Sequence, residues 1–318
     1  MLGPDLIRIR QLEKEDIVQV LDQAETFVEI MDRPIRKVPA LRGTVIVNLF
    51  FEPSTRTRTS FELASKMLSA DVVNISTKVS SVVKGESIKD TALTLKSLGA
   101  DIIIVRHSHA GVPELVSKQG NFSVINGGDG AAEHPTQALL DLFTMRRKLG
   151  ALEGKHVVIM GDISHSRVAR SNIYALKKMG AHVHLVAPPT MIPVHVEQLG
   201  VHVHYHLEEV MDVADVLYLL RIQLERQSES LFPSLKEYAK LYGINGAKLS
   251  RFAKDVIVMH PGPINRGVEI SHDVADGMNT FIEEQVRNGV GVRMAILYLL
   301  GRKDMASEEK EAGNDVVA

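Results

Sequence analysis

Short apolar runs alternate along this chain with segments whose apolar residues have the spacing of a helix. The runs are rich in β-branched residues and too short for helices, so each one predicts a strand. They cover residues 45–51, 101–105, 122–126, 157–160, 183–186, 216–220 and 256–259. Because polar residues rarely interrupt them, the runs are typical of strands that are buried on both faces, as in parallel sheets.

The segments between the runs predict helices. Phe61, Ala64 and Leu68 lie at positions i, i+3 and i+7, and the stretch from Pro135 to about Leu149 has one apolar face. A further apolar helix is expected at residues 290–300. Strands that alternate with helices indicate an α/β fold with right-handed crossovers, in which ligands bind beyond the carboxyl ends of the strands.

The length of 318 residues corresponds to about two domains. We expect residues 1–137 to form one domain and residues 138–287 a second, each a mostly parallel sheet flanked by helices. The helix that starts at Pro135 is expected to bridge the two. The C-terminal helix, at about residues 288–305, is expected to pack back on the first domain, and residues 306–318 to form a frayed tail.

Composition excludes several classes of protein. Lys and Arg number 37 against 39 Asp and Glu, which argues against a protein that coats nucleic acid through bulk charge. The absence of cysteine excludes a disulfide framework, a thiolate nucleophile, a Cys-ligated zinc and an iron–sulfur cluster, and it fits a cytoplasmic location. We find no secretory signal, and we expect no membrane partner because no stretch reaches about 18 uncharged apolar residues.

Residues 54–59, STRTRT, follow the first predicted strand and lead into a helix. Backbone amides at a helix start, four hydroxyls and the guanidiniums of Arg56 and Arg58 are the groups that bind a phosphate. The alternative is a capped helix start with solvated arginines. The nucleotide-binding patterns G-x-x-x-x-G-K-[ST] and G-x-G-x-x-G do not occur, so the turn predicts a phosphate site of another kind.

Further polar groups follow other predicted strands of the first half. Arg106 comes directly after the strand at 101–105, and His134 precedes Pro135 at the start of the bridging helix. Because Pro135 suits the first helical position, we expect His134 to be the N-cap and its imidazole to point out of the helix start. Gln137 lies one turn further on and can face the same way. The alternative is an ordinary helix cap.

In the second half, Arg167 lies in a strand-to-helix turn, and Arg221 and Gln223 come just after the strand at 216–220. Two arginines from separate strands suit a dicarboxylate, because each guanidinium can bind one carboxylate in a bidentate fork. Structural ion pairs are the alternative. Pro261 and Gly262 follow the last predicted strand within the sequence HPGP.

Two other groups leave alternatives open. Ser80 and Lys84 lie in a polar stretch before a predicted helix, which is either a cationic lid over a phosphate or an exposed loop. His202, His204 and His206 alternate with other residues and therefore share one strand face. A metal site would need a carboxylate or further ligand nearby, and none stands out, so a half-exposed strand is favoured.

Seven motifs occur together and in order over about 220 residues: EPSTRTRTSFE, the loop with Ser80, Lys84 and Gly85, VRH, HPTQALLDL, GDISHSRVARSN, LYLLRIQLER and HPGPINRGVEI. Together they resemble the catalytic chains of the aspartate carbamoyltransferases, and the resemblance covers nearly the whole chain. Ornithine carbamoyltransferases share the phosphate motif but typically carry a cysteine in the HPxQ motif, which reads HPTQ here. Many family members have HPLP where this chain has HPGP, a change that bears on the rigidity of that loop.

The resemblance implies transfer of the carbamoyl group from carbamoyl phosphate to L-aspartate, which gives N-carbamoyl-L-aspartate and phosphate in de novo pyrimidine (UMP) biosynthesis. It implies a carbamoyl-phosphate-binding first domain and an aspartate-binding second domain, with no cofactor and no metal. Two alternatives are a transcarbamoylase with another amine acceptor and a non-catalytic scaffold of the same fold.

The resemblance also implies residue roles. The phosphate is held by Ser54, Thr55, Arg56 and Thr57. The carbamoyl carbonyl oxygen is contacted by Arg106, His134 and Thr57. The carbamoyl amino group is received by Gln137 and the backbone at Pro261 and Gly262. Aspartate is bound by Arg167, Arg221 and Gln223. Ser80 and Lys84 reach in from a neighbouring subunit, which implies a homotrimer with shared active sites, and the family also contains assemblies with a regulatory chain or a dihydroorotase-type partner. The catalytic set is Arg56, Thr57, Arg106, His134 and Lys84.

Overall fold

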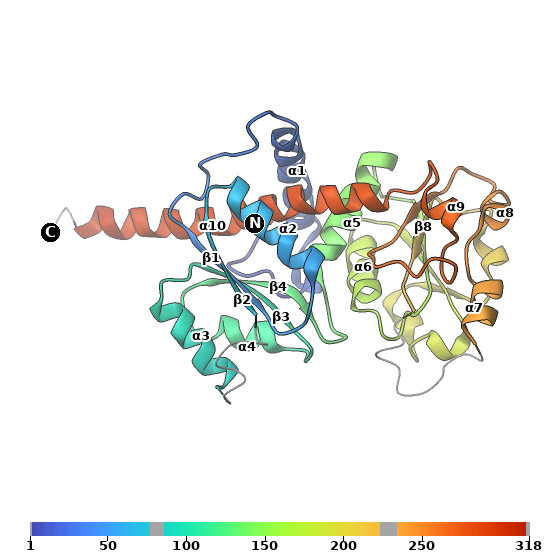
Figure 1. Ribbon diagram of the computed structural model, residues 1–318, viewed down its shortest axis with the longest axis horizontal. Helices are drawn as coiled ribbons and strands as arrows, with labels where there is room; N and C mark the ends of the chain where they lie inside the picture. Colours follow the sequence, from blue (N-terminus) through green and yellow to red (C-terminus); the bar gives the residue numbers. More distant parts are fainter. Residues whose placement is uncertain (1, 77–85, 223–233, 316–318) are drawn as a thin grey trace. The chain divides into compact units, whose positions relative to one another are not determined.

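The computed structural model describes residues 2–76, 86–222 and 234–315, with side chains described as far as residue 301 (Figure 1). The chain forms two compact units. Unit 1 consists of Met1–Leu140 and Arg287–Ala318, and unit 2 consists of Asp141–Val286. No helix in the described part of the chain is long and apolar enough to cross a membrane.

Unit 1 is built on a parallel sheet with the strand order β2-β1-β3-β4. The strands are β1 (Val45–Phe50), β2 (Asp71–Ser76), β3 (Ile102–His107) and β4 (Ser123–Asp129). Its helices are α1 (Lys14–Met31), α2 (Thr55–Met67), α3 (Ile88–Ser97), α4 (Val112–Ser117) and the greater part of α10 (Ile282–Asp315), with a short 3-10 turn, η1 (Ile9–Gln11). The helices cover both faces of the sheet (Figure 1).

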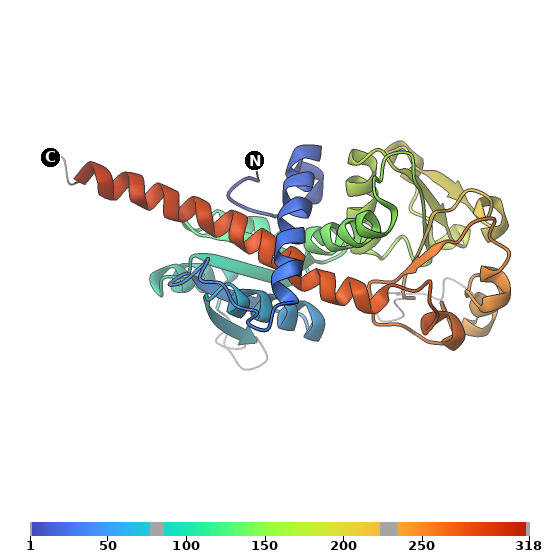
Figure 2. The same cartoon turned by 90° about the horizontal axis from the view of Figure 1, so that it is seen from above.

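One face of this sheet packs against α3 and α4. Val47 and Val105 of the sheet share a buried apolar cluster with Leu95 of α3 and Val116 of α4. The opposite face is covered by α1, α2 and α10, which lie together in Figure 2. A Cβ on Gly301 of α10 would lie 3.6 Å from a methyl carbon of Ile102 in β3, so this helix packs directly on the sheet.

The edge of the unit 1 sheet at β4 is covered by the N-terminal segment. The amide of Leu6 donates to the carbonyl of Val124 at 2.8 Å, and the amide of Asn126 donates to the carbonyl of Leu6 at 2.9 Å. Strand β2 forms the other edge, where Val73 is 47% exposed. The covered edge explains why β4 is buried along its whole length, whereas residues 71–75 of β2 are exposed or half-buried.

Unit 2 is built on a second parallel sheet with the order β7-β6-β5-β8-β9. Its strands are β5 (His156–Met160), β6 (His182–Val186), β7 (His202–His204), β8 (Val216–Leu219) and β9 (Ile257–Met259). Its helices are α5 (Pro135–Leu149, which begins in unit 1), α6 (Arg167–Lys178), α7 (Leu235–Leu241), α8 (Gly246–Leu249) and α9 (His272–Ala275), with the 3-10 turns η3 (Pro189–Met191), η4 (Val196–Leu199) and η5 (Leu207–Val210).

A buried carboxylate connects several elements of unit 2. Asp141 of α5 accepts hydrogen bonds from Asn172 of α6 at 2.9 Å, Tyr218 of β8 at 2.6 Å and Gln285 of α10 at 2.8 Å. Buried polar groups need such partners because an unsatisfied one costs about 1–3 kcal/mol. The carboxylate therefore fixes α5, α6 and the start of α10 over the same face of the sheet.

The histidine ladder, formed by His156, His182, His184, His202 and His204, crosses β5, β6 and β7. His156, His182 and His202 begin their strands, whereas His184 is in the middle of β6 and His204 ends β7. The rings of His156 and His182 stack at 4.7 Å between centroids, and those of His184 and His202 at 5.0 Å. Within the described residues, no group of three or more His, Cys, Asp or Glu is arranged to hold a metal ion. The strand predicted at His202 and His204 is confirmed, and His206 follows it as the cap of η5.

The predicted α/β class with two parallel sheets is confirmed, and so are all seven predicted strands, with ends that differ by at most three residues. Helix α5 has the bounds expected for the bridging helix. The sequence reasoning missed β2, and it placed the last helix at about residues 288–305, with its apolar part at 290–300, although α10 runs from Ile282 to Asp315. The functional domain limits and the frayed tail remain predictions.

Candidate functional site

The turn between β1 and α2 has the form of an anion site. Helix α2 begins at Thr55, and Ser54 precedes it with extended backbone and with no capping hydrogen bond from its hydroxyl. Thr57 is buried, whereas Thr55 and Arg56 are exposed. The first amides of a helix lack intrahelical acceptors and lie at the positive end of the helix dipole, so this turn offers donors to an anion.

Arg106 lies at the end of β3, beside this turn. Its carbonyl accepts a hydrogen bond from the amide of Phe51 at 2.8 Å, which joins the ends of β3 and β1. Its guanidinium donates from Nη1 to the carbonyl of Gly127 at 3.0 Å, and its Nε lies 3.3 Å from a carboxylate oxygen of Glu52. Contacts on two sides fix the plane of the guanidinium, and its side chain is 13% exposed.

His134 lies where the chain leaves β4 and enters α5. The helix begins at Pro135, as predicted, and the carbonyl of His134 accepts from the amide of Gln137 at 3.0 Å. His134 is buried, and Gln137 is half-buried. The polar residues of unit 1 therefore follow β1, β3 and β4, which are neighbours in the sheet and end at the same edge.

His107, the residue after Arg106, also lies at this edge. Its ring packs against Phe51, with centroids 4.8 Å apart. Burial lowers the pKa of His107, and the nearby His109 lowers it further, while the carboxylate of Glu52 acts in the opposite direction. Around neutral pH the uncharged form of this imidazole is therefore favoured.

In unit 2, the turn after β5 places Arg167 at the start of α6. Ser166 caps the helix by accepting from the amide of Ala169 at 3.1 Å, and Asp162 contacts Nδ1 of His165 at 2.8 Å. These local bonds hold the GDISHSR turn, and Arg167, at the first helical position, is 4% exposed. A guanidinium buried this far needs anionic or hydrogen-bonding partners.

Arg221 follows β8, the neighbour of β5. The amide of Leu220 donates to the carbonyl of Met160 at 2.8 Å, and Gly161 turns the chain beside it with a φ of +127°. A Cβ at Gly161 would lie 2.8 Å from the carbonyl oxygen of Leu220, so only glycine allows this close approach. The residue after Leu220 is Arg221, which lies at the same edge as the GDISHSR turn.

The next strand, β9, is followed by His260, Pro261 and Gly262. Nδ1 of His260 accepts from the amide of Gly262 at 2.8 Å, and its own amide donates to Gln285 at 2.9 Å. Nε2 of the same ring lies 3.3 Å from Glu269. The turn that carries the carbonyls of Pro261 and Gly262 is therefore anchored through one buried imidazole.

The structure places eleven of the residues predicted to form the site at the carboxyl ends of strands, in two groups. In unit 1 they are Ser54, Thr55, Arg56, Thr57, Arg106, His134 and Gln137, and in unit 2 they are Arg167, Arg221, Pro261 and Gly262. Ser80, Lys84 and Gln223 lie outside the described residues. Sequence reasoning missed Glu52 and the carbonyl of Gly127, which hold Arg106; Glu52 was visible in the motif, whereas a backbone carbonyl leaves no signal.

Each unit matches one domain of a known family. Residues 4–147 match the carbamoyl-phosphate-binding domain of aspartate/ornithine carbamoyltransferase, and residues 153–300 match the aspartate/ornithine-binding domain. The chain belongs to the aspartate/ornithine carbamoyltransferase family. Two relatives within this carbamoyltransferase family are the aspartate carbamoyltransferase catalytic subunits of Syntrophus aciditrophicus and Desulforamulus reducens. They are 55% and 56% identical to this chain over 93% of its length, and the matches cover 96% and 95% of the relatives.

Solved carbamoyltransferases have the same fold. Aspartate transcarbamoylase from Trypanosoma cruzi in complex with carbamoyl phosphate has a TM-score of 0.84 at 31% identity, covering 92% of this chain and 95% of its own. The catalytic subunit of M. jannaschii aspartate transcarbamoylase also has a TM-score of 0.84, at 36% identity, covering 95% of this chain and 99% of its own. The Trypanosoma cruzi enzyme has been solved with N-(phosphonacetyl)-L-aspartic acid as well.

Proposed function

We propose that this chain transfers the carbamoyl group of carbamoyl phosphate to the amine of L-aspartate, giving N-carbamoyl-L-aspartate and phosphate. Family membership supports the reaction type, and relatives at 55–56% identity that are named aspartate carbamoyltransferase support aspartate as the acceptor. Within the chain, the observation that carries the proposal is that the motif residues cluster on neighbouring strand ends of each sheet.

In unit 1, we assign the phosphate of carbamoyl phosphate to the turn at residues 54–57. The amides at the start of α2, the hydroxyls of Ser54, Thr55 and Thr57, and the guanidinium of Arg56 are donors for the phosphate oxygens. Charge-assisted hydrogen bonds contribute about 1.5–3 kcal/mol each, so a few of them hold a small phosphorylated ligand. Arg56 also stabilises the charge on the departing phosphate.

Arg106, His134 and Thr57 are assigned to the carbonyl oxygen of the carbamoyl group. Negative charge develops on this oxygen when the amine attacks, and donors that are already fixed in place lower the barrier. The contacts of Arg106 with Gly127 and Glu52 support such fixed geometry. Gln137, one turn after His134, is assigned to the carbamoyl amino group.

In unit 2, Arg167 and Arg221 are assigned to the two carboxylates of aspartate, each through a bidentate fork. Gln223 is assigned to the same substrate. The carbonyls of Pro261 and Gly262 are acceptors and are assigned to the carbamoyl amino group. The positions of Arg167 and Arg221 after the neighbouring strands β5 and β8 support this pairing.

The chemical step balances without a covalent enzyme intermediate. The nitrogen of aspartate forms a bond to the carbamoyl carbon, and the bond from that carbon to the phosphate oxygen breaks. The amine must lose one proton, for which we propose the phosphate as acceptor, and we assign no side chain as a base. The described side chains then act by binding, orienting and stabilising charge.

Three further statements belong to the proposal and rest on the family resemblance. The product enters pyrimidine biosynthesis, the protein acts in the cytoplasm, and it forms a homotrimer in which Ser80 and Lys84 complete the active site of a neighbouring subunit. The same resemblance leaves open whether a regulatory chain or a dihydroorotase-type partner binds the trimer.

An acceptor screen tests the function. The purified chain is incubated with carbamoyl phosphate and, in parallel, with L-aspartate, L-ornithine or N-acetyl-L-ornithine, and both phosphate release and the carbamoylated product are measured. We expect product with aspartate only. A product with ornithine or its acetylated form would identify a different transcarbamoylase, and no product with any acceptor would indicate a scaffold.

A further inference from the structure

Residues 127–133, which are the last three residues of β4 and the loop that follows them (together called the 127–133 loop), carry a group of the proposed carbamoyl site at each end. At its start, the carbonyl of Gly127 accepts a hydrogen bond from Arg106 at 3.0 Å. Directly after its end comes His134. The geometry of this loop therefore sets the position of two residues that we assign to the carbamoyl carbonyl oxygen.

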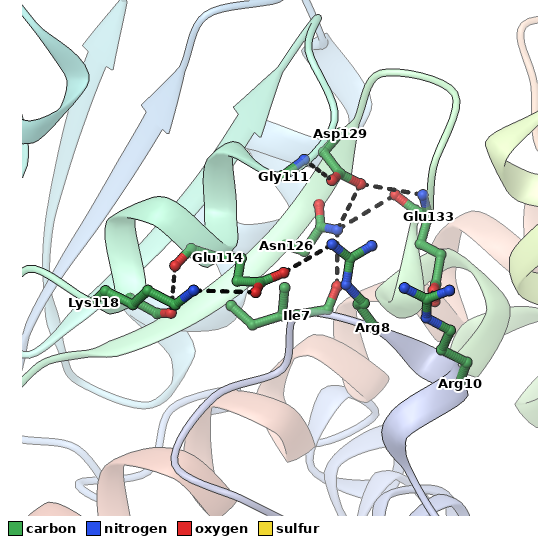
Figure 3. A network of polar contacts seen from close by, with 10 residues as sticks. Ile7, Arg8, Arg10, Gly111, Glu114, Lys118, Asn126, Asp129 and Glu133 are labelled. Carbon is green, nitrogen blue, oxygen red and sulfur yellow. Dashed lines mark hydrogen bonds and ion pairs between the residues drawn. The ribbon is translucent and has the colours of Figure 1, made fainter.

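A single buried carboxylate, Asp129, organises the loop (Figure 3). Its Oδ1 accepts from Nδ2 of Asn126 at 2.9 Å and from the amide of Glu133 at 3.1 Å, and its Oδ2 accepts from the amide of Gly111 at 2.9 Å. Its own amide donates to the carbonyl of Glu133 at 3.2 Å. Asp129 is 1% exposed, so these bonds form away from solvent and close the loop at its neck.

Asn126 completes the same network. Its Nδ2 donates to Asp129 and to the carbonyl of Ile7 at 2.9 Å, and its Oδ1 accepts from the amide of Gly128 at 2.7 Å. Because Gly127 lies between Asn126 and Gly128, this bond fixes the peptide units on both sides of the carbonyl that holds Arg106. Every oxygen and nitrogen named here makes at least one hydrogen bond, as buried polar groups require.

The tip of the loop packs closely on the segment that follows β3. The amide of Gly130 donates to the carbonyl of His107 at 2.9 Å, and its φ is +48°. A Cβ at Gly130 would lie 2.8 Å from the amide nitrogen of Ala110. The loop is therefore held on the segment that follows β3, the strand that carries Arg106.

The last residue of the loop, Glu133, ties it to the N-terminal segment. Its Oε2 accepts from the amide of Ile9 at 2.6 Å. Its Oε1 lies 3.5 Å from Nε of Arg10, whose side chain is drawn near Glu133 in Figure 3. The carboxylate is 2% exposed, and burial raises the pKa of Glu133 while the amides of Ile9 and Arg10 lower it. This contact holds the backbone directly before His134.

We propose that Asp129, with Asn126 and Glu133, is a positioning residue for carbamoyl transfer: it fixes the Gly127 carbonyl and His134 so that Arg106 and the imidazole meet the carbamoyl oxygen. The inference rests on the proposed function for its substrate. It predicts a selective defect, because the network acts on the groups assigned to the carbonyl and leaves the phosphate turn at residues 54–57 untouched.

The test compares two probes that differ at the carbonyl. Phosphonoacetamide has a phosphonate and a carbamoyl-like carbonyl, whereas inorganic phosphate has no carbonyl, and binding of each to the full chain is measured by calorimetry. With Asp129→Asn, the dissociation constant for phosphonoacetamide is expected to rise about tenfold or more, the effect of losing one well-placed charge-assisted hydrogen bond. The constant for inorganic phosphate is expected to change less than about twofold.

Glu114→Gln is the matched control. Glu114 pairs with Arg8 of the same N-terminal segment at 2.9 Å, but no contact joins it to the loop in Figure 3. We expect it to bind both probes as the unmodified chain does. Glu133→Gln replaces Asp129→Asn if the latter fails to fold, as judged by its thermal unfolding, and it is expected to show the same selectivity at about threefold.

Equal weakening of both probes, or unchanged binding of phosphonoacetamide, overturns the positioning role. This outcome is separate from the acceptor screen. If the selective defect appears while aspartate is not carbamoylated, the proposed substrate is wrong and the positioning role stands. If aspartate is carbamoylated and the defect is not selective, the function stands and the positioning role fails.

Discussion

At the scale of single residues, the proposed chemistry depends on how a guanidinium is held. Arg106 contacts a backbone carbonyl through Nη1 and the carboxylate of Glu52 through Nε. A planar, rigid fork can make both contacts and still direct its remaining N–H groups elsewhere. A lysine ammonium is a point charge on a flexible chain, so it cannot reproduce this arrangement.

We therefore expect Arg106→Lys to lower kcat/KM by about a hundredfold or more, the usual cost of a lost donor at a developing oxyanion. Phosphate release with aspartate as acceptor measures it, alongside the thermal unfolding midpoint. Arg251→Lys is the control, because Arg251 also pairs with a carboxylate, Glu208, but both side chains are more than half exposed. A loss below about threefold for Arg106→Lys would contradict the assigned role.

Residue types and motif order were enough to predict most of the candidate site. Arg106 was visible because it comes directly after an apolar run, and Arg56 and Arg167 were visible because each lies in a polar turn that follows such a run. The groups that hold these arginines and the loop before His134 in place were not visible. A backbone carbonyl such as that of Gly127 has no sequence signature, and Asp129 contacts Gly111, a residue that only the fold brings near.

At the scale of elements, a strand's place in its sheet determines whether its sequence pattern predicts it. Central strands such as β1 and β5 are nearly continuous apolar runs because helices cover both faces of their sheets. All of the central strands were predicted. The missed strand, β2, is an edge strand whose Asp71 and Asn74 interrupt the apolar pattern. At the edge of the other sheet, β7 carries histidines in place of apolar residues.

The histidine ladder is a chain of hydrogen bonds across three strands. Nδ1 of His156 lies 2.9 Å from Nε2 of His184, whose Nδ1 lies 3.0 Å from Nε2 of His204, whose Nδ1 lies 3.2 Å from Glu209. A carboxylate only accepts, so His204 donates to it and each ring in turn donates from Nδ1. Protonating His184 would place two donors face to face and break one of these bonds.

Charged groups at both ends of the ladder affect its titration. Glu209 lies beside His204, and Asp215 and Lys254 lie near His156. Burial, followed by the charges of the neighbouring histidines, lowers the pKa of His184 to about 4, so His184 is uncharged in the folded chain at neutral pH. The unfolded chain binds more protons between pH 4 and the ordinary histidine value of about 6.5, so stability is full above that value and falls as the pH drops.

Urea unfolding at pH 7.5 and pH 5 tests this expectation. Between the two, the unmodified chain should lose about 1–2 kcal/mol more of its free energy of unfolding than His184→Leu, after allowance for solvent screening. His202→Ala, at an exposed ring of the same ladder, should keep most of the pH dependence, because burial of His184 is the largest cause of its lowered pKa. The expectation fails if His184→Leu responds to acid as strongly as the unmodified chain.

At the scale of the whole molecule, the two units have a common plan. Each has a parallel sheet with polar groups on three neighbouring strand ends, and each has one sheet edge covered by a short segment from elsewhere in the chain. In unit 1 that segment contains Leu6, and in unit 2 the amide of Phe281 donates to the carbonyl of Val258 at 3.0 Å. Apolar runs predicted the sheets. The short segments that cover the sheet edges have no periodic pattern, because each makes only one or two backbone hydrogen bonds, and they were not predictable.

The proposed trimer makes its own prediction, because Arg56 and Lys84 would serve one site from different subunits. Arg56→Ala and Lys84→Ala chains should each be inactive, and an equal mixture that is dissociated and reassembled should recover activity at about one quarter of its sites. Phosphate release measures the recovery.

A mixture of Arg56→Ala with His134→Ala is the control, since both residues would belong to the same subunit's contribution and no intact site can form. Recovery in this control, or none in the first mixture, would contradict a site shared through Lys84.

Unit 2 is one continuous stretch of chain, whereas unit 1 is closed only by α10 from the far end of the sequence. Gly301 of that helix packs beside Ile102, so the part of the sheet face that α10 covers, next to α1 and α2, stays exposed until almost all the rest of this sequence has been synthesised. Unit 1, whose synthesis begins first, is thus the last to be completed. Unit 2 is synthesised in full before α10 and can fold before unit 1 does.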